Sequence, residues 1–216
     1  FDAAGDALVR ATFVGLQPGS GDFTFDGPES FSVAGVGEND VSEWFSVEAG
    51  TYSVNAVGGL FDVYQSSTEL DLAAGDVISV VVYATDGTIF GTGIGTAVFK
   101  DDYSALSGRS SRIRTAHLDR NVGAVDVLQL QPTAQAIASN VEIGAVGGWF
   151  GTLAGAIQLG IDATGDGQAD ITYTSTPIPP GRAINTLVTE GDDGESEVVL
   201  FTRIGELEIN PDGTGP

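Results

Sequence analysis

The chain has 216 residues, of which 42% are hydrophobic, and a formal net charge of −22 at pH 7. This charge disfavours binding to nucleic acid or to anionic membrane, because such a surface repels phosphate groups. The absence of cysteine excludes a disulfide framework and thiol chemistry, and no apolar run is long enough to cross a membrane as a helix.

Short stretches rich in β-branched and aromatic residues recur along the chain and are bounded by Gly, Pro or Asp, a pattern typical of strands. In chain order, those of the first half are 8–15, 21–27, 51–57, 77–83 and 96–100. Residues 51–57 and the following 60–66 predict a hairpin with Gly58 and Gly59 at the turn. Gly50 and Gly75 each precede a strand, where a turn requires positive φ. Only 133–140 offers a short helical turn as an alternative.

The second half repeats the first. Arg10 and Asp22 recur 104 positions later as Arg114 and Asp126. Three further pairs follow with offsets of 105, 105 and 106 positions, namely Trp44 and Trp149, Gly50 and Gly155, and Gly75 and Gly181. We therefore expect an all-β protein of two tandem immunoglobulin-like (transthyretin-like) β-sandwich domains, residues 1–106 and 107–216.

The recurrence of Arg10 with Asp22, and of Arg114 with Asp126, favours two structural ion pairs that join strands. The only histidine, His117, corresponds to Phe13 in the first repeat. A position that accepts both Phe and His is more typical of an inward strand position than of a proton-transfer site. The recurring tryptophans favour packing over a sugar-binding surface.

Residues 162–170, DATGDGQAD, are the most specific local motif. Asp162, Thr164, Asp166 and Asp170 stand at positions 1, 3, 5 and 9 of a calcium-binding loop, with Gly167 at position 6. The twelfth position is Tyr173 and not the bidentate Glu of an EF-hand, so the motif resembles the loops of extracellular repeats more than those of a calcium sensor. Two interpretations stay open: a calcium loop of the extracellular-repeat kind, or an acidic hairpin turn.

The pattern R-x-x-H, A-V-D-V, S-N-V-x-x-G and A-G-T-Y resembles a domain of unknown function found, often in tandem, in exported bacterial and archaeal surface proteins. The residues that carry the resemblance are 114–117, 124–127, 139–144 and 49–52. The resemblance implies sandwiches and an extracellular setting but no activity. The S-P-D segment usual in that family is missing from both repeats.

We therefore expect a non-enzymatic, secreted cell-surface protein: the repeating subunit of a pilus-like filament that assembles as a homopolymer by terminal strand addition. A chain that begins at Phe1 fits the removal of a signal peptide. The alternative is a monomeric adhesion module that binds glycans or neighbouring surface proteins. A hydrolase would require turnover that depends on His117. Beyond calcium, the sequence indicates no cofactor.

Overall fold

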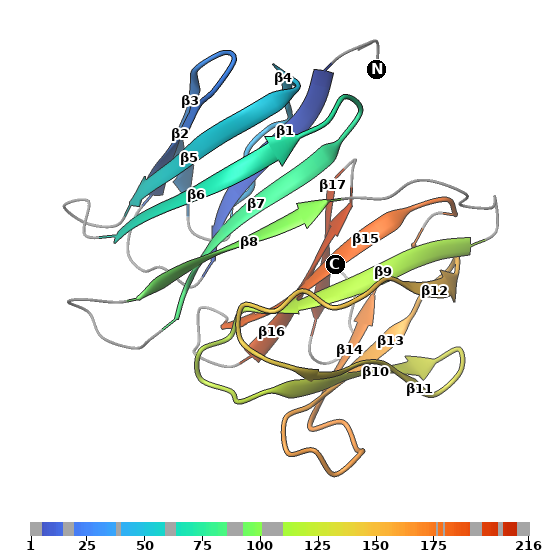
Figure 1. The fold of residues 1–216 in the computed structure, drawn as a ribbon. Coiled ribbons are helices and arrows are strands. Elements are labelled where there is room, and N and C mark those ends of the chain that lie inside the picture. Colours follow the sequence, from blue (N-terminus) through green and yellow to red (C-terminus); the bar gives the residue numbers. More distant parts are fainter. Residues whose placement is uncertain are drawn as a thin grey trace. The chain divides into compact units, whose positions relative to one another are not determined.

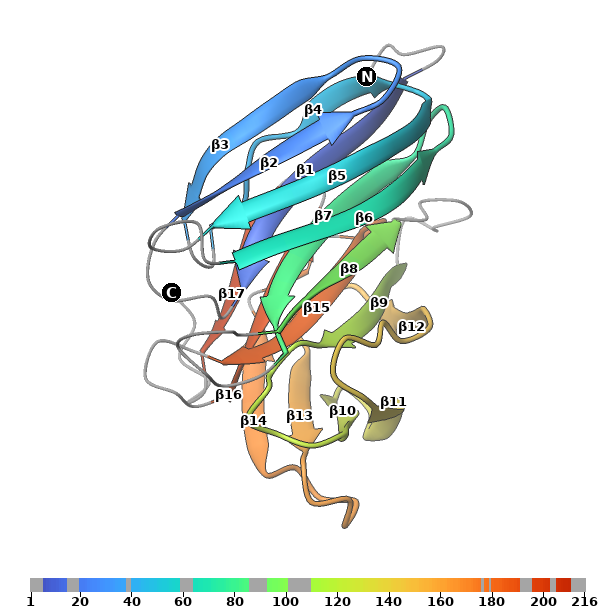
Figure 2. The same ribbon diagram turned by 60° about the vertical axis from the view of Figure 1, so that its left-hand side comes forward.

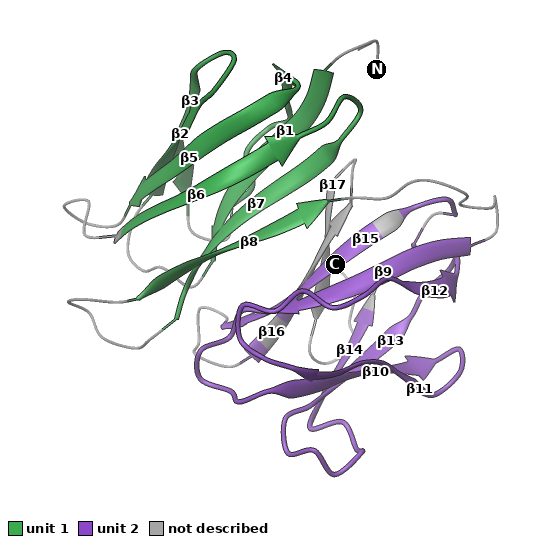
Figure 3. Cartoon of the chain, in the orientation of Figure 1, with its two compact units in different colours: residues 1–101 green, residues 102–216 purple. Residues whose placement is uncertain are grey.

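The computed structural model describes residues 6–14, 20–37, 40–58, 64–85, 93–100, 110–175, 177–178, 180–190, 196–202 and 205–210. Throughout these ranges the protein is built from β-strands and contains no helix (Figure 1). The chain divides into two compact units, Phe1–Asp101 and Asp102–Pro216 (Figure 3). The boundary expected between residues 106 and 107 lies outside the described residues.

Unit 1 contains eight strands among its described residues: β1 (Asp6–Val14), β2 (Ser20–Asp26), β3 (Phe31–Gly37), β4 (Phe45–Glu48), β5 (Gly50–Gly58), β6 (Tyr64–Leu72), β7 (Val77–Ala84) and β8 (Ile94–Lys100). They form two sheets of four strands, in the orders β4-β1-β7-β8 and β3-β2-β5-β6, which Figure 2 shows as two layers. All pairs are antiparallel except β1 with β7, which are parallel.

Apolar side chains at alternate strand positions fill the space between the two layers of unit 1. Val9, Ala11 and Phe13 project from β1, and Phe23 and Phe25 project from β2, all into one buried cluster. Aromatic rings continue through this cluster, with centroids 4.5 Å apart for Phe13 and Phe23 and 4.4 Å apart for Phe25 and Phe31. Such offset and tilted ring contacts add to the stabilisation from burial.

Unit 2 contains β9 (Ser110–His117), β10 (Val125–Gln131), β11 (Gln135–Val141), β12 (Phe150–Leu153), β13 (Gln158–Asp162), β14 (Ile171–Ser175), β15 (Ala183–Glu190), β16 (Ser196–Thr202) and β17 (Gly205–Asn210). Its sheet has the order β11-β10-β13-β14-β17-β16-β15-β9-β12. On either side of β17 this order repeats the two sheets of unit 1, with β9 and β15 parallel like β1 and β7. Among the described strands, β17 is the one without a counterpart in unit 1.

The strands predicted in the first half are present as β1, β2, β5, β7 and β8. Two predictions need correction. The β5–β6 hairpin exists, but Gly58 pairs with Tyr64, so residues 59–63, outside the described residues, lie between them in place of a two-residue turn. The segment 133–140 contributes to β11 and not to a helix, because its residues pair with β10.

The glycines before strands behave as expected: φ is 82° at Gly75 and 74° at its counterpart Gly181. An L-residue with a side chain rarely adopts this conformation, so glycine recurs at this turn in both units.

Candidate assembly site and the recurring polar residues

The two arginines that recur in the repeat bind across neighbouring parallel strands. Arg10 on β1 lies opposite Ser79 on β7, and its Nε donates a hydrogen bond of 2.9 Å to the Ser79 Oγ. Arg114 on β9 lies opposite Asn185 on β15, and its Nε donates to Oδ1 at 2.7 Å. Each arginine therefore binds the residue directly opposite it on the neighbouring parallel strand.

Each guanidinium also stacks on a tryptophan. The Arg10 Cζ lies 4.6 Å from the centre of the Trp44 ring, and the Arg114 Cζ lies 4.3 Å from that of Trp149. Both tryptophans are partly buried and lie outside the hydrophobic clusters. Their recurrence reflects a cation–π contact on the outer face of the sheet.

The expected ion pairs of Arg10 with Asp22 and of Arg114 with Asp126 are wrong. Arg10 points away from the core on one sheet, whereas Asp22 points away from the core on the other. The core therefore separates the two side chains. In unit 2, Arg114 binds Asn185 while Asp126 binds a backbone amide of its own hairpin.

The two aspartates instead stabilise matching β-bulges. Asp22 Oδ1 accepts the backbone N–H of Gly35 at 2.8 Å, and Asp126 Oδ1 accepts that of Asn140 at 2.6 Å. Both hairpins shift register beside the aspartate. Gly35 has φ 69° and Asn140 has φ 50°, so each bulge places one residue in the left-handed region.

His117 is fully buried at the end of β9. Its Nε2 lies 2.8 Å from the carbonyl oxygen of Gly123 and 3.2 Å from that of Val122, so Nε2 carries the proton and donates. Its Nδ1 has no hydrogen-bond partner among the described residues. The imidazole thus anchors the loop that leads to β10.

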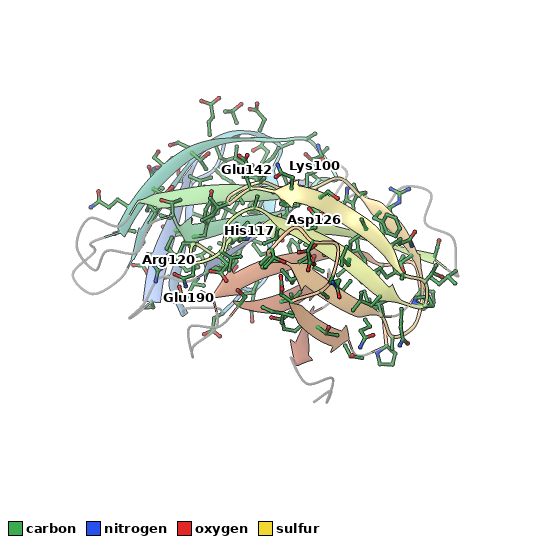
Figure 4. All side chains as sticks on the ribbon, turned by 90° about the horizontal axis from the view of Figure 1, so that it is seen from below. Lys100, His117, Arg120, Asp126, Glu142 and Glu190 are labelled. Atoms are coloured by element: carbon green, nitrogen blue, oxygen red, sulfur yellow. The ribbon has the colours of Figure 1, made fainter. Side chains whose placement is uncertain are left out.

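A polar cluster that the sequence did not predict lies just beyond the end of β9. It consists of Asp119 and Arg120, which follow His117 in the chain, and of Glu190 and Ser196, which pair with each other in β15 and β16. Asp119 is buried and accepts the Ser196 hydroxyl, and Arg120 Nη2 lies 3.1 Å from Glu190 Oε2 (Figure 4). The counterparts of Glu190 and Ser196 in unit 1 are Ala84 and Ile94. Alignment of the two repeats could have revealed this change from apolar to polar residues.

This cluster does not arrange Ser196 for nucleophilic attack. Its hydroxyl donates to Asp119, whereas His117 Nε2 donates to backbone carbonyls. In a Ser-His-Asp triad the serine hydroxyl donates to the imidazole, whereas here it donates directly to a carboxylate. The contacts of the described residues therefore lend no support to the hydrolase hypothesis.

The acidic loop, residues 162–170, begins at the last residue of β13 and folds around Asp162, which is only 1% exposed. Its Oδ1 accepts the backbone N–H of Gly165 at 2.6 Å and its Oδ2 that of Gly167 at 2.7 Å. Asp170 Oδ2 accepts the N–H of Ala163 at 2.8 Å, and Asp166 Oδ1 that of Gln168 at 2.8 Å.

Desolvation raises the pKa of Asp162, but hydrogen bonds from the backbone of residues 164–167 outweigh it and hold that pKa below its ordinary value. The motif thus brings Asp162, Thr164, Asp166 and Asp170 into one loop. Backbone donors satisfy its carboxylates, and no group of three metal-ligating side chains occurs among the described residues. Calcium binding stays a prediction.

The free sheet edges form the candidate assembly site. On one side of each sandwich the edges are interrupted or short: β3 and β11 contain register shifts, and β4 and β12 have four residues each. On the other side of unit 2, β17 pairs with both β14 and β16. The corresponding β6 and β8 of unit 1 keep one regular register with their neighbours.

A groove lies on the interrupted side of unit 1. It has a volume of about 380 Å³ and is lined by residues 32–37 of β3, by residues 40–43 and by Phe45 at the start of β4. Its lining therefore combines two acidic residues, Asp40 and Glu43, with apolar residues such as Val33 and Phe45.

The chain matches the family described as Domain of unknown function (DUF4397) over residues 13–128, which is more than half of its length. It belongs to the DUF4397 family. The match begins in β1 and ends in β10, so it crosses from unit 1 into unit 2. The DUF4397 description carries no activity.

No curated protein matches the chain. Among solved structures, the chain is similar to the Bacillus anthracis TIE protein, with 10% sequence identity and a TM-score of 0.28. The similarity covers 97% of this chain and 44% of that one, so the chain spans less than half of its length. Within the described residues, no helix has the length and hydropathy to cross a membrane.

Proposed function

We propose that this protein is a non-enzymatic structural subunit of an extracellular, cell-surface filament, and that its copies join by addition of a strand to a sheet edge. The observation that carries the proposal is β17. This last described strand pairs with β16 and β14 and so unites two sheets into one. The fold thus already uses strand addition on this side of a sandwich.

An open, repeated contact between a strand and an edge produces a filament, because a head-to-tail interface that does not close into a ring continues indefinitely. The net charge of −22 opposes close approach of subunits. Screening by salt or divalent cations reduces this repulsion, since the Debye length is about 8 Å at physiological ionic strength. Assembly should therefore increase with ionic strength.

Electron microscopy of the purified full chain, across a series of salt concentrations, tests the proposal. We expect filaments whose number and length increase with salt. A monodisperse monomer at high protein concentration and at every salt concentration would contradict it. Sedimentation velocity on the same samples provides an independent measure of the assembled fraction.

The groove beside β3 supports a second candidate, a monomeric adhesion module. Its mixed lining of acidic and apolar residues suits a ligand with hydroxyl or cationic groups. Glycan-array binding that is weakened by Asp40→Ala and Glu43→Ala, in a protein that stays monomeric, would select this function over the filament.

We also propose that each unit belongs to the immunoglobulin-like (transthyretin-like) class of sandwiches. The support is the shared arrangement of two four-stranded layers with one parallel pair, β1 with β7 and β9 with β15. A crystal structure of each unit, compared with sandwiches of known topology, tests this assignment.

A further inference from the structure

The edges of the two units are protected unequally. Long, regular edge strands expose backbone donors and acceptors and invite pairing with another chain, so proteins shorten them, interrupt them or cover them. Here β3 and β11 are interrupted by bulges, β4 and β12 are short, and β14 and β16 are covered by β17. Among the described strands, β6 and β8 alone lack such protection.

The register of β8 shows which backbone groups face its free edge. Thr85 N–H donates to the Gly93 carbonyl at 2.8 Å, and the antiparallel register continues without a shift to Lys100. Hydrogen-bonded pairs alternate along such a ladder. Ala97 therefore directs its backbone groups to β7, whereas Val98 directs its N–H and C=O away from β7.

The repeat shows where a strand would sit on this edge. In unit 2, Leu207 of β17 pairs with Leu200 of β16, which pairs with Thr186 of β15. The counterpart of Thr186 is Val80 of β7, and Val80 pairs with Val98. Val98 thus occupies in unit 1 the position that faces Leu207 in unit 2.

Charge distinguishes β8 from β6. Glu69 and Asp71 are exposed on β6, where they would repel the acidic segment Gly205–Asn210. β8 ends at Lys100, the only lysine of the chain, whose side chain is 59% exposed and lies 2.8 Å from Asp76. In the register of the repeat, Lys100 falls opposite Gly205 and next to Glu206.

We propose that β17 is the donor strand and β8 the acceptor edge: residues 205–210 of one copy leave β14 and β16 of their own unit and pair with β8 of a second copy, in the register that places Leu207 opposite Val98 in place of Leu200. This inference rests on the proposed filament and identifies the contact between neighbouring subunits, which we call the joint.

Single cysteines in separate chains test the joint, because the protein has none of its own. Val98→Cys and Leu207→Cys are purified separately, mixed under conditions that promote assembly and oxidised. Directly opposed antiparallel residues have Cα atoms about 4.5 to 5.5 Å apart, within the range of a disulfide. A crosslinked dimer on a non-reducing gel can then arise only between copies.

Glu206→Cys, paired with Val98→Cys, is the matched control, since a shift of one residue moves the thiol to the opposite face of the strand. We expect several-fold less crosslinking from it. The double variant Leu200→Cys with Leu207→Cys reports whether β17 remains on its own unit 2.

The outcomes distinguish failure of the proposed β17–β8 contact from failure of the proposed filament. If filaments form but Val98→Cys and Leu207→Cys crosslink no more than the control, the joint is overturned and the filament stands. Crosslinking of separate Leu200→Cys and Leu207→Cys chains in place of the Val98 pair would overturn it in favour of strand exchange between two copies of unit 2. If no filaments form in the unmodified protein, the proposed function itself fails.

Proline variants provide a second readout. Val98→Pro removes a donor that faces the free edge and leaves the β7 ladder intact, whereas Ala97→Pro removes a ladder bond. We expect Val98→Pro to abolish filaments while the protein stays folded by circular dichroism, and Ala97→Pro to unfold unit 1. Filaments of normal abundance from folded Val98→Pro would overturn the proposal.

Discussion

Asp126 accepts a hydrogen bond of 2.6 Å from the backbone amide of Asn140, and this contact shapes the bulge between β10 and β11. Unit 1 repeats it with Asp22 and Gly35. The aspartate is therefore common to both bulges, while the left-handed position is filled by Asn in one and by Gly in the other.

We predict that Asp126→Ala lowers the stability of unit 2 by about 1 to 2 kcal/mol, because it leaves the Asn140 amide without its acceptor. Asn140→Gly should cost at most a few tenths of a kcal/mol, since glycine adopts positive φ readily, whereas Asn140→Val should cost about 1 to 2 kcal/mol. Thermal and chemical unfolding of the three variants measures these differences. Equal stability of Asn140→Gly and Asn140→Val would contradict the role of backbone conformation.

The exchange of Phe13 for His117 is compensated by its neighbours. A Cβ on Gly21 would come within 2.1 Å of the Phe13 ring, so the ring occupies the space above that glycine. In unit 2 the corresponding residues are His117 and Val125. The larger side chain, Phe13, is thus combined with glycine at position 21, and the smaller one, His117, with valine at position 125.

We predict that His117→Phe destabilises unit 2 by about 1 to 3 kcal/mol through overpacking against Val125. The double variant His117→Phe with Val125→Gly should recover part of this loss, because it restores the pairing found in unit 1. A double-mutant cycle by urea unfolding measures the coupling. Strict additivity of the two substitutions would show that the residues do not compensate each other.

Stability should depend on the ionisation of Asp162. Its pKa is lower in the folded protein than the unfolded value of about 3.9, so its contribution is fully present above that value. The contribution is lost as the pH falls through the folded pKa. We predict that unfolding temperatures of wild type and Asp162→Asn differ most above pH ~5 and converge in strong acid. Asp166→Asn is the control, since the Asp166 carboxylate accepts from residue 168 alone among the backbone amides described. A difference that stays constant down to strong acid would refute the prediction.

The same loop yields a prediction about metal. Because backbone amides already bind the Asp162 and Asp170 carboxylates, we expect its conformation to persist in chelator. The melting temperature in EDTA and in millimolar calcium then separates the two interpretations, because a bound ion raises it and a turn held by hydrogen bonds alone leaves it unchanged. A calcium-dependent increase that disappears in Asp166→Asn would instead establish the calcium loop. Calorimetric titration with calcium gives the affinity directly.

Sequence reasoning succeeded where the signal is local and failed where it depends on which strands become neighbours. The β-branched and aromatic residues of 8–15 predict a strand, which is present as β1, and the recurring Gly75 and Gly181 predict a turn. Arg10 and Asp22 recur together, but their spacing does not reveal that β1 and β2 belong to different sheets. The partner of Arg10 is Ser79, distant in sequence and adjacent only because β1 and β7 are parallel neighbours.

The amino-acid sequence by itself determined the all-β character, the repeat and the positions that require glycine, because these depend on short-range periodicity and backbone conformation. Tertiary structure alone decided that Arg114 stacks on Trp149, that Asp126 stabilises a bulge, and that β17 covers the edges of unit 2 while β8 pairs with β7 alone among the described strands. These features depend on the order of strands within a sheet, which arises when distant segments pair and which local propensities do not encode.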